Sequence, residues 1–297
     1  MKRVLLILMI GMMSLTSAQT LKPYVMGAES PQALSVVKVA TQSAIELANF
    51  TILGEYMPAG DESRWVYIIN TPGMIKAIQA TGGLTAFAAA LRVGLTEESG
   101  VTKISYTDPE YLGNAYFQKS YQDVAHHFVD AKNQLMALMD SLGTIVNQPF
   151  GMEKGLTPKE VGKYHYMFGM EYFEDVVELT EFSSYEVGKS IIRSKLSKGG
   201  DTNLVYSIEI PGQKATLYGI DLGGDTGESH FLPIIDIGTP KHTAFLPYEI
   251  LLTGNKAVMM HGRYRIALAF PDLTMTTFSK IMSTPGDIEE LMRSVTE

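Results

Sequence analysis

The stretch TPGMIKAIQATGGLTAF, from Thr71 to Phe87, contains two short words that return later in the chain. The later stretch, TPKHTAF, runs from Thr239 to Phe245, so Thr-Pro and Thr-Ala-Phe recur in the same order. Fewer residues separate the two words the second time, as happens when one loop has shortened. Recurrence of words at a nearly fixed period indicates an internal repeat. These words therefore predict that the chain carries one folding unit twice.

The residues around the first stretch alternate between helical and strand patterns. Apolar residues at helical spacing predict a helix that begins at Ser30. Runs rich in β-branched and aromatic residues predict strands at 49–57 and 64–72, and the alternating run at 101–109 predicts half of a hairpin. A helix from about Tyr121 to Leu142, with apolar residues along one face, completes the unit.

The second half of the chain repeats this order of patterns. A serine pair at 183–184 is typical of a helix start, and strands are predicted at 202–210 and 231–240. A final helix is predicted at 287–295. Two such units predict an α+β fold with two similar domains, each an antiparallel sheet backed by helices.

The start of the chain has the pattern of a secretory signal peptide. Lys2 and Arg3 precede an apolar run, and small residues end at Ala18. The apolar run is shorter than the roughly twenty residues that cross a membrane, so we expect cleavage and no membrane span afterwards. The expected location is periplasmic or secreted. The predicted segments are a signal peptide at 1–18, a first α+β repeat at 19–146, a connecting segment with a helix at 147–172, and a second α+β repeat at 173–297.

Four words in the two halves resemble a known bacterial family. They are YTDPEYLGNAYF at 106–117, IINTP at 68–72, GGDTNLVYSIEIPG at 199–212 and IIDIGTP at 234–240. They are similar to the "domain of unknown function 302" family, which the chain would contain as tandem copies at about 21–145 and 172–297.

The resemblance implies a compact α+β fold in which an antiparallel sheet is backed by helices. Members often associate through that sheet, which keeps a homodimer open for this chain. The second copy has Phe270-Pro271 where the first has Asp108-Pro109, so a role for the aspartate does not carry over. The function of the family is unassigned, and the resemblance therefore implies a fold and no mechanism.

Composition excludes several classes of function. The chain has 32 acidic residues against 24 lysines and arginines, a formal net charge of −8 at pH 7. An acidic surface repels phosphate backbones, so no nucleic-acid partner is expected. The absence of cysteine excludes disulfides, a thiolate nucleophile and clusters held by thiolates. No G-x-S-x-G, H-E-x-x-H, G-x-G-x-x-G or P-loop pattern occurs, so no cofactor is expected.

A polar flank of the predicted helix at 121–142 offers metal-ligating side chains. Asp123, His127 and Asp130 share this flank, and His126 lies beside them. Imidazole and carboxylate groups suit zinc, but a structural or catalytic site needs a further ligand that the sequence does not identify. The alternative is an exposed helical flank, and we favour it.

A second candidate is His261, which lies on the same face of a predicted strand as Met259. Thioether and imidazole ligands suit copper in an exported protein. Methionine is also common in packed cores, and this second interpretation is favoured.

The connecting segment is rich in aromatic residues. Thr157 and Glu160 form a capping box that predicts a helix running to about Tyr172. Since aromatic and apolar residues occupy nearly every side of that helix, we expect it to be buried between the domains or across a dimer.

Three functions are open at this stage. The leading hypothesis is a noncatalytic exported protein that binds an unknown small ligand or a protein partner at the junction of its two domains. The first alternative is a metal-assisted enzyme that uses His126, His127 or His261 with nearby carboxylates. The second alternative is a structural module that docks onto a larger exported complex through the segment 164–173.

Overall fold

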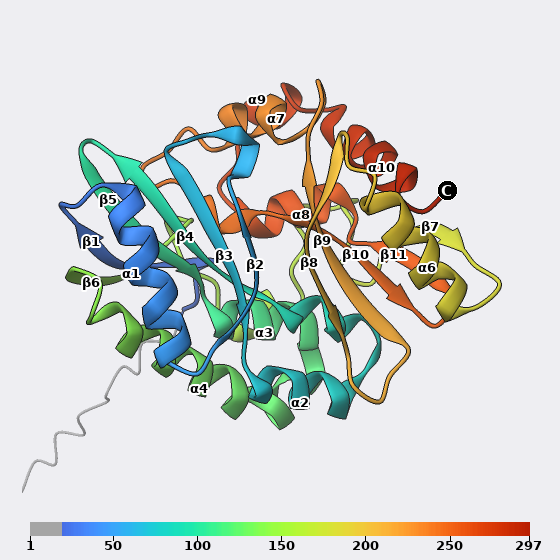
Figure 1. Cartoon of the computed structure of the whole chain (residues 1–297), viewed down its shortest axis with the longest axis horizontal. Helices are drawn as coiled ribbons and strands as arrows, with labels where there is room; N and C mark the ends of the chain where they lie inside the picture. Colours follow the sequence, from blue (N-terminus) through green and yellow to red (C-terminus); the bar gives the residue numbers. More distant parts are fainter. Residues whose placement is uncertain (1–19) are drawn as a thin grey trace, which may run out of the picture.

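The computed structural model describes residues 20–297, and the predicted signal peptide at 1–18 lies outside the described residues. The fold is α+β, with two antiparallel sheets and helices around them (Figure 1). The fold class predicted from the sequence is therefore confirmed. Within residues 20–297, no helix combines the length and the apolar character needed to cross a membrane.

The first half of the molecule contains six strands, which together form one sheet. Helices and 3-10 turns (η) connect them. The elements are β1 (Tyr24–Ser30), α1 (Leu34–Leu47), β2 (Thr51–Tyr56), η1 (Pro58–Gly60), β3 (Arg64–Asn70), α2 (Pro72–Thr81), η2 (Gly83–Ala89), β4 (Leu91–Glu98), β5 (Val101–Thr107), α3 (Pro109–Phe117), η3 (Gln118–Ser120), α4 (Tyr121–Met139) and β6 (Thr144–Phe150).

The second half forms a sheet of five strands, which follows the short helix α5 (Pro158–Val161). Its elements come in a similar order. They are β7 (Val177–Glu181), α6 (Tyr185–Leu196), β8 (Thr202–Glu209), β9 (Ala215–Leu222), α7 (Glu228–Ile235), η4 (Thr243–Phe245), β10 (Tyr248–Thr253), β11 (Lys256–Met259), α8 (Gly262–Ala269), α9 (Met275–Ser279) and α10 (Thr284–Ser294).

The two sheets have the same strand order when each half is numbered from its own first strand. The first sheet runs β2-β3-β4-β5-β1-β6, and the second runs β8-β9-β10-β11-β7. In both, the first strand of the half pairs with the last strand of the hairpin. The extra strand β6 pairs with the other side of β1 and extends the first sheet to Phe150, past the predicted boundary at 146.

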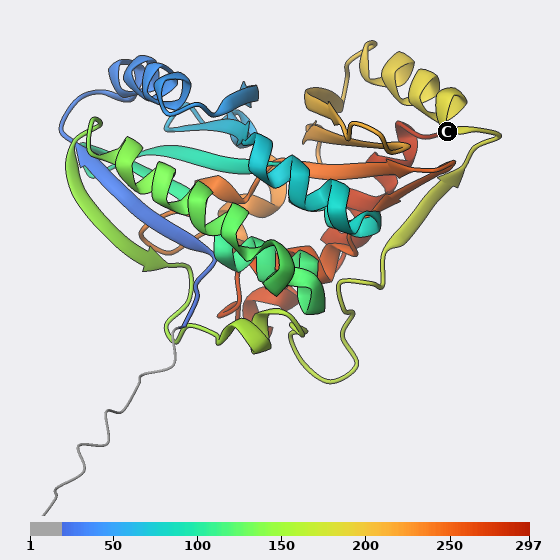
Figure 2. The same ribbon diagram turned by 90° about the horizontal axis from the view of Figure 1, so that it is seen from below.

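The two halves meet along the edge strands β2 and β8, which lie side by side in the middle of the molecule (Figure 1). The approach is so close that a Cβ atom on Gly54 would lie 2.2 Å from the backbone oxygen of Val205. Glycine is the only residue without a Cβ atom, so glycine at position 54 allows the two strands to approach this closely. Figure 2 shows α1 and α6 on the same side of the two sheets.

The other face of each sheet is covered in part by a segment from the opposite half. Turn η4 of the second half packs against β4 and β5, and turn η2 of the first half packs against β9 and β10. Thr96 and Thr243 share a hydrogen bond of 2.5 Å between their hydroxyls, and the Thr107 hydroxyl donates to the Ala244 carbonyl at 3.4 Å. The repeated word Thr-Ala-Phe thus lies in both exchanged segments, with Ala86 and Phe87 in one core cluster and Ala244 and Phe245 in the other.

Several predicted elements are found close to their expected positions. The hairpin of β4 and β5, the long helix α4 and the helix α6 all form, and Ser184 caps α6 by accepting from the Val187 amide at 3.3 Å. The first helix starts later than predicted, at Leu34, because Ser30 is the last residue of β1.

The predicted strand at 231–240 is wrong. This stretch begins as the helix α7, and the strand that pairs with β8 is instead β9. The apolar run Phe231 to Ile235 suits either structure, because short apolar runs do not separate a buried strand from a buried helix. Pro233 lies inside the helix.

The helix predicted from Thr157 to Tyr172 is also largely wrong. The capping box between Thr157 and Glu160 is present, but α5 ends at Val161. The rest of the segment is irregular, and Phe168 is 99% exposed. The segment is therefore not buried between the two halves, although Phe173 enters the core, and burial across a dimer stays a prediction.

The helices α3 and α8 occupy equivalent places after the two hairpins. The side chain of Asp108 caps α3, and that of His261 caps α8. Phe117 ends α3, and Phe270 directly follows α8. The element order thus aligns His261 with Asp108, and the expected match of Phe270-Pro271 with Asp108-Pro109 is wrong.

Candidate functional site

The metal-ligand candidates of the first half lie on α4, whose apolar face is buried. Asp123 and Asp130 are exposed, and His127 is half-buried against Gly73 of α2. The rings of His126 and His127 are 3.9 Å apart. Burial, together with the neighbouring His126, lowers the pKa of His127.

His261, the candidate of the second half, has protein partners for both ring nitrogens. Its Nδ1 accepts from the Arg263 amide at 3.3 Å, and its Nε2 lies 3.4 Å from a carboxylate oxygen of Glu171. The ring therefore caps α8 and holds the end of the connecting segment. Within residues 20–297, no three histidine, aspartate or glutamate side chains are grouped so that they could hold a metal ion.

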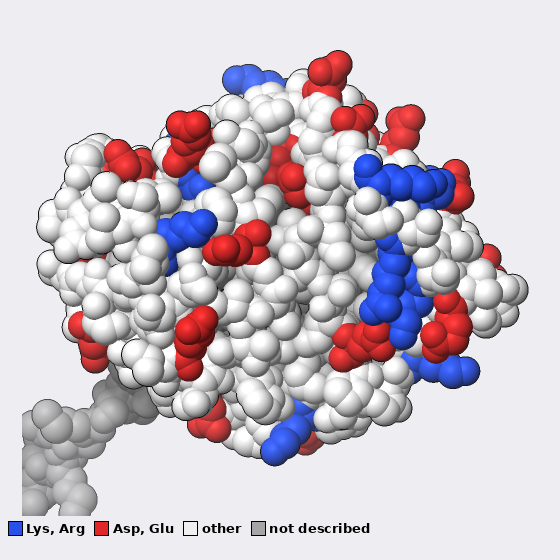
Figure 3. Space-filling view, viewed as in Figure 1, with Lys and Arg blue, Asp and Glu red and all other residues white. Residues whose placement is uncertain are grey.

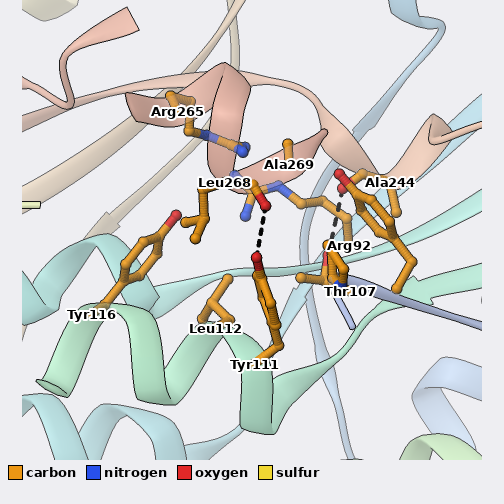
Figure 4. Close-up of a pocket in the computed structure, with 11 residues that line it drawn as sticks. Arg92, Thr107, Tyr111, Leu112, Tyr116, Ala244, Arg265, Leu268 and Ala269 are labelled. Carbon is orange, nitrogen blue, oxygen red and sulfur yellow. Dashed lines mark hydrogen bonds between the residues drawn. The ribbon is translucent and has the colours of Figure 1, made fainter. Parts of the chain in front are cut away.

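A small cavity lies at the junction of the two halves, between α3 and α8 (Figure 4). Its volume is about 30 Å³, and every lining residue is buried. The polar lining residues are Tyr24, Arg92, Thr107, Tyr111, Tyr116 and Arg265.

A buried ionic cluster adjoins this cavity. Arg92 of β4 forms an ion pair and a hydrogen bond with Glu249 of β10, so the pair joins the two sheets. The Tyr206 hydroxyl donates to the same carboxylate at 3.0 Å. The Nε of Arg265 lies 3.8 Å from the other carboxylate oxygen, and its Nη2 donates to the Phe245 carbonyl at 2.5 Å.

Burial determines the protonation of this cluster. It lowers the pKa of the Arg92 guanidinium, but an arginine starts so high that it stays charged. It raises the pKa of the Tyr206 hydroxyl to about 12, so the tyrosine is a neutral donor. The cluster therefore contains two positive charges and one negative charge.

A second polar contact across the junction centres on Glu228, the first residue of α7. Its carboxyl group accepts from the Tyr56 hydroxyl at 3.1 Å and from the Ala59 amide at 2.9 Å. The residue is 0% exposed, and no lysine or arginine pairs with it among the ion pairs of the described residues. Burial, with a smaller contribution from Asp221, raises the pKa of Glu228 to about 8.

A third contact joins Arg64 of β3 to Asp236, which follows α7. The Arg64 Nη1 donates to Asp236 at 2.5 Å, and the ring of His242 lies 2.8 Å from the same carboxylate. Burial tends to raise the pKa of the Asp236 carboxyl, but the hydrogen bonds and charge of His242, together with the charge of Arg64, hold it below its usual range. The opposite charges of Arg64 and Asp236 compensate each other, and the pair links the two halves.

The junction cavity is too small for an organic ligand. Small-molecule sites generally have volumes of roughly 300–1,000 Å³, whereas this cavity has about 30 Å³. A metabolite at the domain junction therefore has no room in this conformation.

A larger hollow lies along the connecting segment. Its volume is about 650 Å³, and it is lined by residues before, within and after α5 and by Pro271. The lining residues include Met152, Leu156, Lys163, Tyr164, His165 and Tyr166. The hydroxyls of Tyr164 and Tyr166 donate to the carbonyls of Ala267 and Leu273, which fixes the segment to the second half.

Apolar side chains of the same segment face solvent. Phe168 is 99% exposed, Met167 is 45% exposed and Tyr172 is 45% exposed. Large apolar side chains that gather at the surface mark interaction sites more often than isolated ones do. This part of the connecting segment therefore lies at the surface and does not pack inside the molecule.

Charged residues are distributed without one dominant basic surface on the face shown in Figure 3. Acidic side chains are scattered over that face, and basic side chains gather over α6, which contains Lys189, Arg193 and Lys195. Glu209 forms ion pairs with the first two.

The sequence patterns did not point to Arg92, Glu249, Arg265 or Glu228. Arg92, Glu249 and Glu228 each gain their role from a contact with the other half, which no local periodicity encodes. Arg265 contacts Glu249 and the Phe245 carbonyl within its own half. A charged residue inside an apolar run, as in AAALRVGL around Arg92 and LPYEILL around Glu249, is the signal that marks two of them.

Comparisons with known proteins give little further information. No family model matches the chain, and no curated protein matches it. Among solved structures, the chain is similar to an uncharacterized conserved protein, DUF302, from Bacillus stearothermophilus. The identity is 13%, the match covers 40% of this chain and 97% of that chain, and the TM-score is 0.35.

Proposed function

We propose that the protein is an exported, noncatalytic binding protein, built from a duplicated domain, that docks onto a protein partner through its connecting segment. The observation that carries this proposal is that Phe168, in the segment that connects the two halves, is almost completely exposed. Exposing a phenylalanine ring costs free energy in water, and that cost is recovered when a partner covers the ring.

The common strand order of the two sheets supports descent from one repeated unit of the "domain of unknown function 302" type. The recurrence of Thr-Ala-Phe in the two exchanged turns supports it as well. A superposition of β1–β5 with α1 on β7–β11 with α6 tests it, and unlike backbone paths would contradict it.

Export is proposed from the pattern of residues 1–18 alone. Cell fractionation with N-terminal sequencing of the mature protein tests it. Cleavage after Ala18 and recovery outside the cytoplasm are the expected results.

The partner surface is tested by Phe168→Asp in the otherwise intact mature chain. Because the ring has hardly any contact within the molecule, the substitution is expected to leave the melting temperature within about 1 °C, as surface substitutions usually do. The expected effect is loss of a complex that wild-type protein forms in its native host, measured by cross-linking and by light scattering after size exclusion.

Leu47→Asp is the matched control, because Leu47 is 84% exposed on α1, away from the connecting segment. This variant is expected to retain the complex. If both variants assemble as the wild type does, or if both lose the complex alike, the connecting segment is not the docking surface.

A further inference from the structure

We propose that the junction cavity is a binding site for one small monovalent anion of halide size, held between Arg92 and Arg265. This site is separate from the connecting segment, and its existence does not depend on the proposed partner. Figure 4 shows the side chains of the two arginines approaching each other at the cavity.

The first support is the unpartnered donors of two buried arginines. Arg92 is 2% exposed and Arg265 is 6% exposed. Within the part of the chain that the structure describes, neither Nε atom has a hydrogen-bond partner. A buried donor without a partner costs about 1–3 kcal/mol, so a pair of them at one cavity indicates that something accepts there.

The second support is the balance of charge. Two guanidinium groups face one carboxylate, that of Glu249, and burial, together with the charge of Arg265, lowers the pKa of Arg92. The guanidinium of Arg265 also lies over the rings of Phe245, at 4.8 Å, and Tyr248, at 5.9 Å, which compensates it in part. A monovalent anion would bring the cluster to neutrality, whereas a water molecule would not.

The third support is the fit between the cavity and the ligand. A volume of about 30 Å³ admits one small ion or a water molecule or two. It excludes phosphate and carboxylate compounds, which are several times larger. The Tyr111 hydroxyl is already committed to the Leu268 carbonyl at 3.0 Å, so the donors that line the cavity are the two guanidinium groups and the hydroxyls of Tyr24 and Tyr116.

The other charged groups around the cavity do not oppose this assignment. Glu249 is engaged by Arg92 and Tyr206, and the cavity is lined by the arginines rather than by this carboxylate. The negative charge of Asp236 acts on Tyr24, which lines the cavity, but Asp236 forms an ion pair with Arg64.

Chloride is the probe for the solution experiment. The melting temperature of the mature protein is measured as sodium chloride replaces sodium isethionate at constant ionic strength and pH. A ligand that binds only the folded state stabilises it in proportion to RT ln(1 + [L]/Kd), so the melting temperature is expected to rise with chloride. At chloride concentrations above Kd, the melting temperature should continue to rise with the logarithm of the chloride concentration.

Two arginines of α8 provide a matched pair of variants. Arg265→Gln removes the charge at the cavity and is expected to abolish the chloride dependence. Arg263→Gln removes the same charge from the same helix at an exposed position, where the side chain contacts Glu171, and is expected to retain it. If Arg265→Gln does not fold, Glu249→Gln replaces it, and its melting temperature should rise more with chloride than that of the wild type, because the anion then balances two positive charges that no carboxylate offsets.

Crystals of the wild-type protein soaked in bromide provide the direct test. An anomalous peak within hydrogen-bond distance of Arg92 and Arg265 is the expected result. A melting temperature that is indifferent to chloride, together with bromide peaks at the surface only, would overturn the assignment and leave the cavity to water.

Discussion

The two turns that follow β2 and β8 make reciprocal contacts across the junction, but with different chemistry. Turn η1 of the first half meets α7 through the buried carboxyl group of Glu228. The turn at 210–214 of the second half meets α2 through exposed amides, where Gln79 Nε2 donates to the Pro211 carbonyl at 2.7 Å and Gln213 Nε2 donates to the Ile78 carbonyl at 3.3 Å.

The difference shows that one architectural contact can be retained while its chemistry diverges. The amide contact is open to water, so its hydrogen bonds can be exchanged for bonds to solvent at little cost. The Glu228 contact is sealed on the acceptor side, because the Glu228 carboxyl group is 0% exposed, while its donors Tyr56 and Ala59 are half-buried. Only the sealed contact should be important for stability, and only it should respond to pH.

The largest effect is expected from Glu228→Ala. The substitution leaves the Tyr56 hydroxyl and the Ala59 amide without their acceptor and opens a cavity in the junction. We expect a loss of about 3–5 kcal/mol in the free energy of unfolding, from unsatisfied donors and lost packing together. Urea unfolding at pH 6 measures it, and a loss below about 1 kcal/mol would mean that water replaces the carboxyl group.

A somewhat smaller effect is expected from pH. The pKa of Glu228 is about 8 in the folded protein, above the ordinary 4.5. Between these values the unfolded chain has released its proton while the folded chain retains it, so the stability from this group is present below about pH 4.5 and lost as pH rises to about 8. Glu228→Gln removes this titration.

The comparison of wild type with Glu228→Gln isolates that group from other titrations. The difference in free energy of unfolding is expected to move by about 2–4 kcal/mol in favour of the glutamine variant between pH 5 and pH 9, since one pKa unit corresponds to about 1.4 kcal/mol. Parallel stability curves for the two proteins would show that Glu228 titrates normally.

The smallest effect is expected from Gln213→Ala at the open contact. Its side-chain amide bonds the carbonyls of Ile78 and Gln79 near the surface, where water can take its place. We expect a loss of at most about 0.5 kcal/mol, with no dependence on pH, in the same urea titrations. A loss equal to that of Glu228→Ala would remove the distinction between the two contacts.

The sequence predicts elements whose pattern is long and regular. Helix α4 and the hairpin of β4 and β5 follow from periods that extend over many residues. Helix α7 was mistaken for a strand because its apolar run is short. The sequence predicts a buried helix for the aromatic residues after Val161, and this prediction fails because composition does not reveal whether aromatic side chains are buried or exposed.

The candidate sites were much harder to predict than the fold class. The residues of the junction come together only when both halves fold, so Arg92 meets Glu249, and Tyr56 meets Glu228, across long sequence separations. The histidines offered obvious chemistry, but His261 caps a helix and its ring contacts Glu171. Residue type alone therefore did not point to the residues of the junction.

The meeting of β2 and β8 also removes one open edge from each sheet, which has a consequence for solubility. Unpaired edges invite strand addition and aggregation. At the outer edge of the second sheet, Arg293 of α10 donates to the carbonyls of Leu179, at 2.5 Å, and Glu178, at 3.1 Å, of β7. At the outer edge of the first, β6 contains Pro149, which has no amide hydrogen to offer to a neighbouring chain. The protein thus limits amyloid-like association at each of these edges without relying on a disulfide.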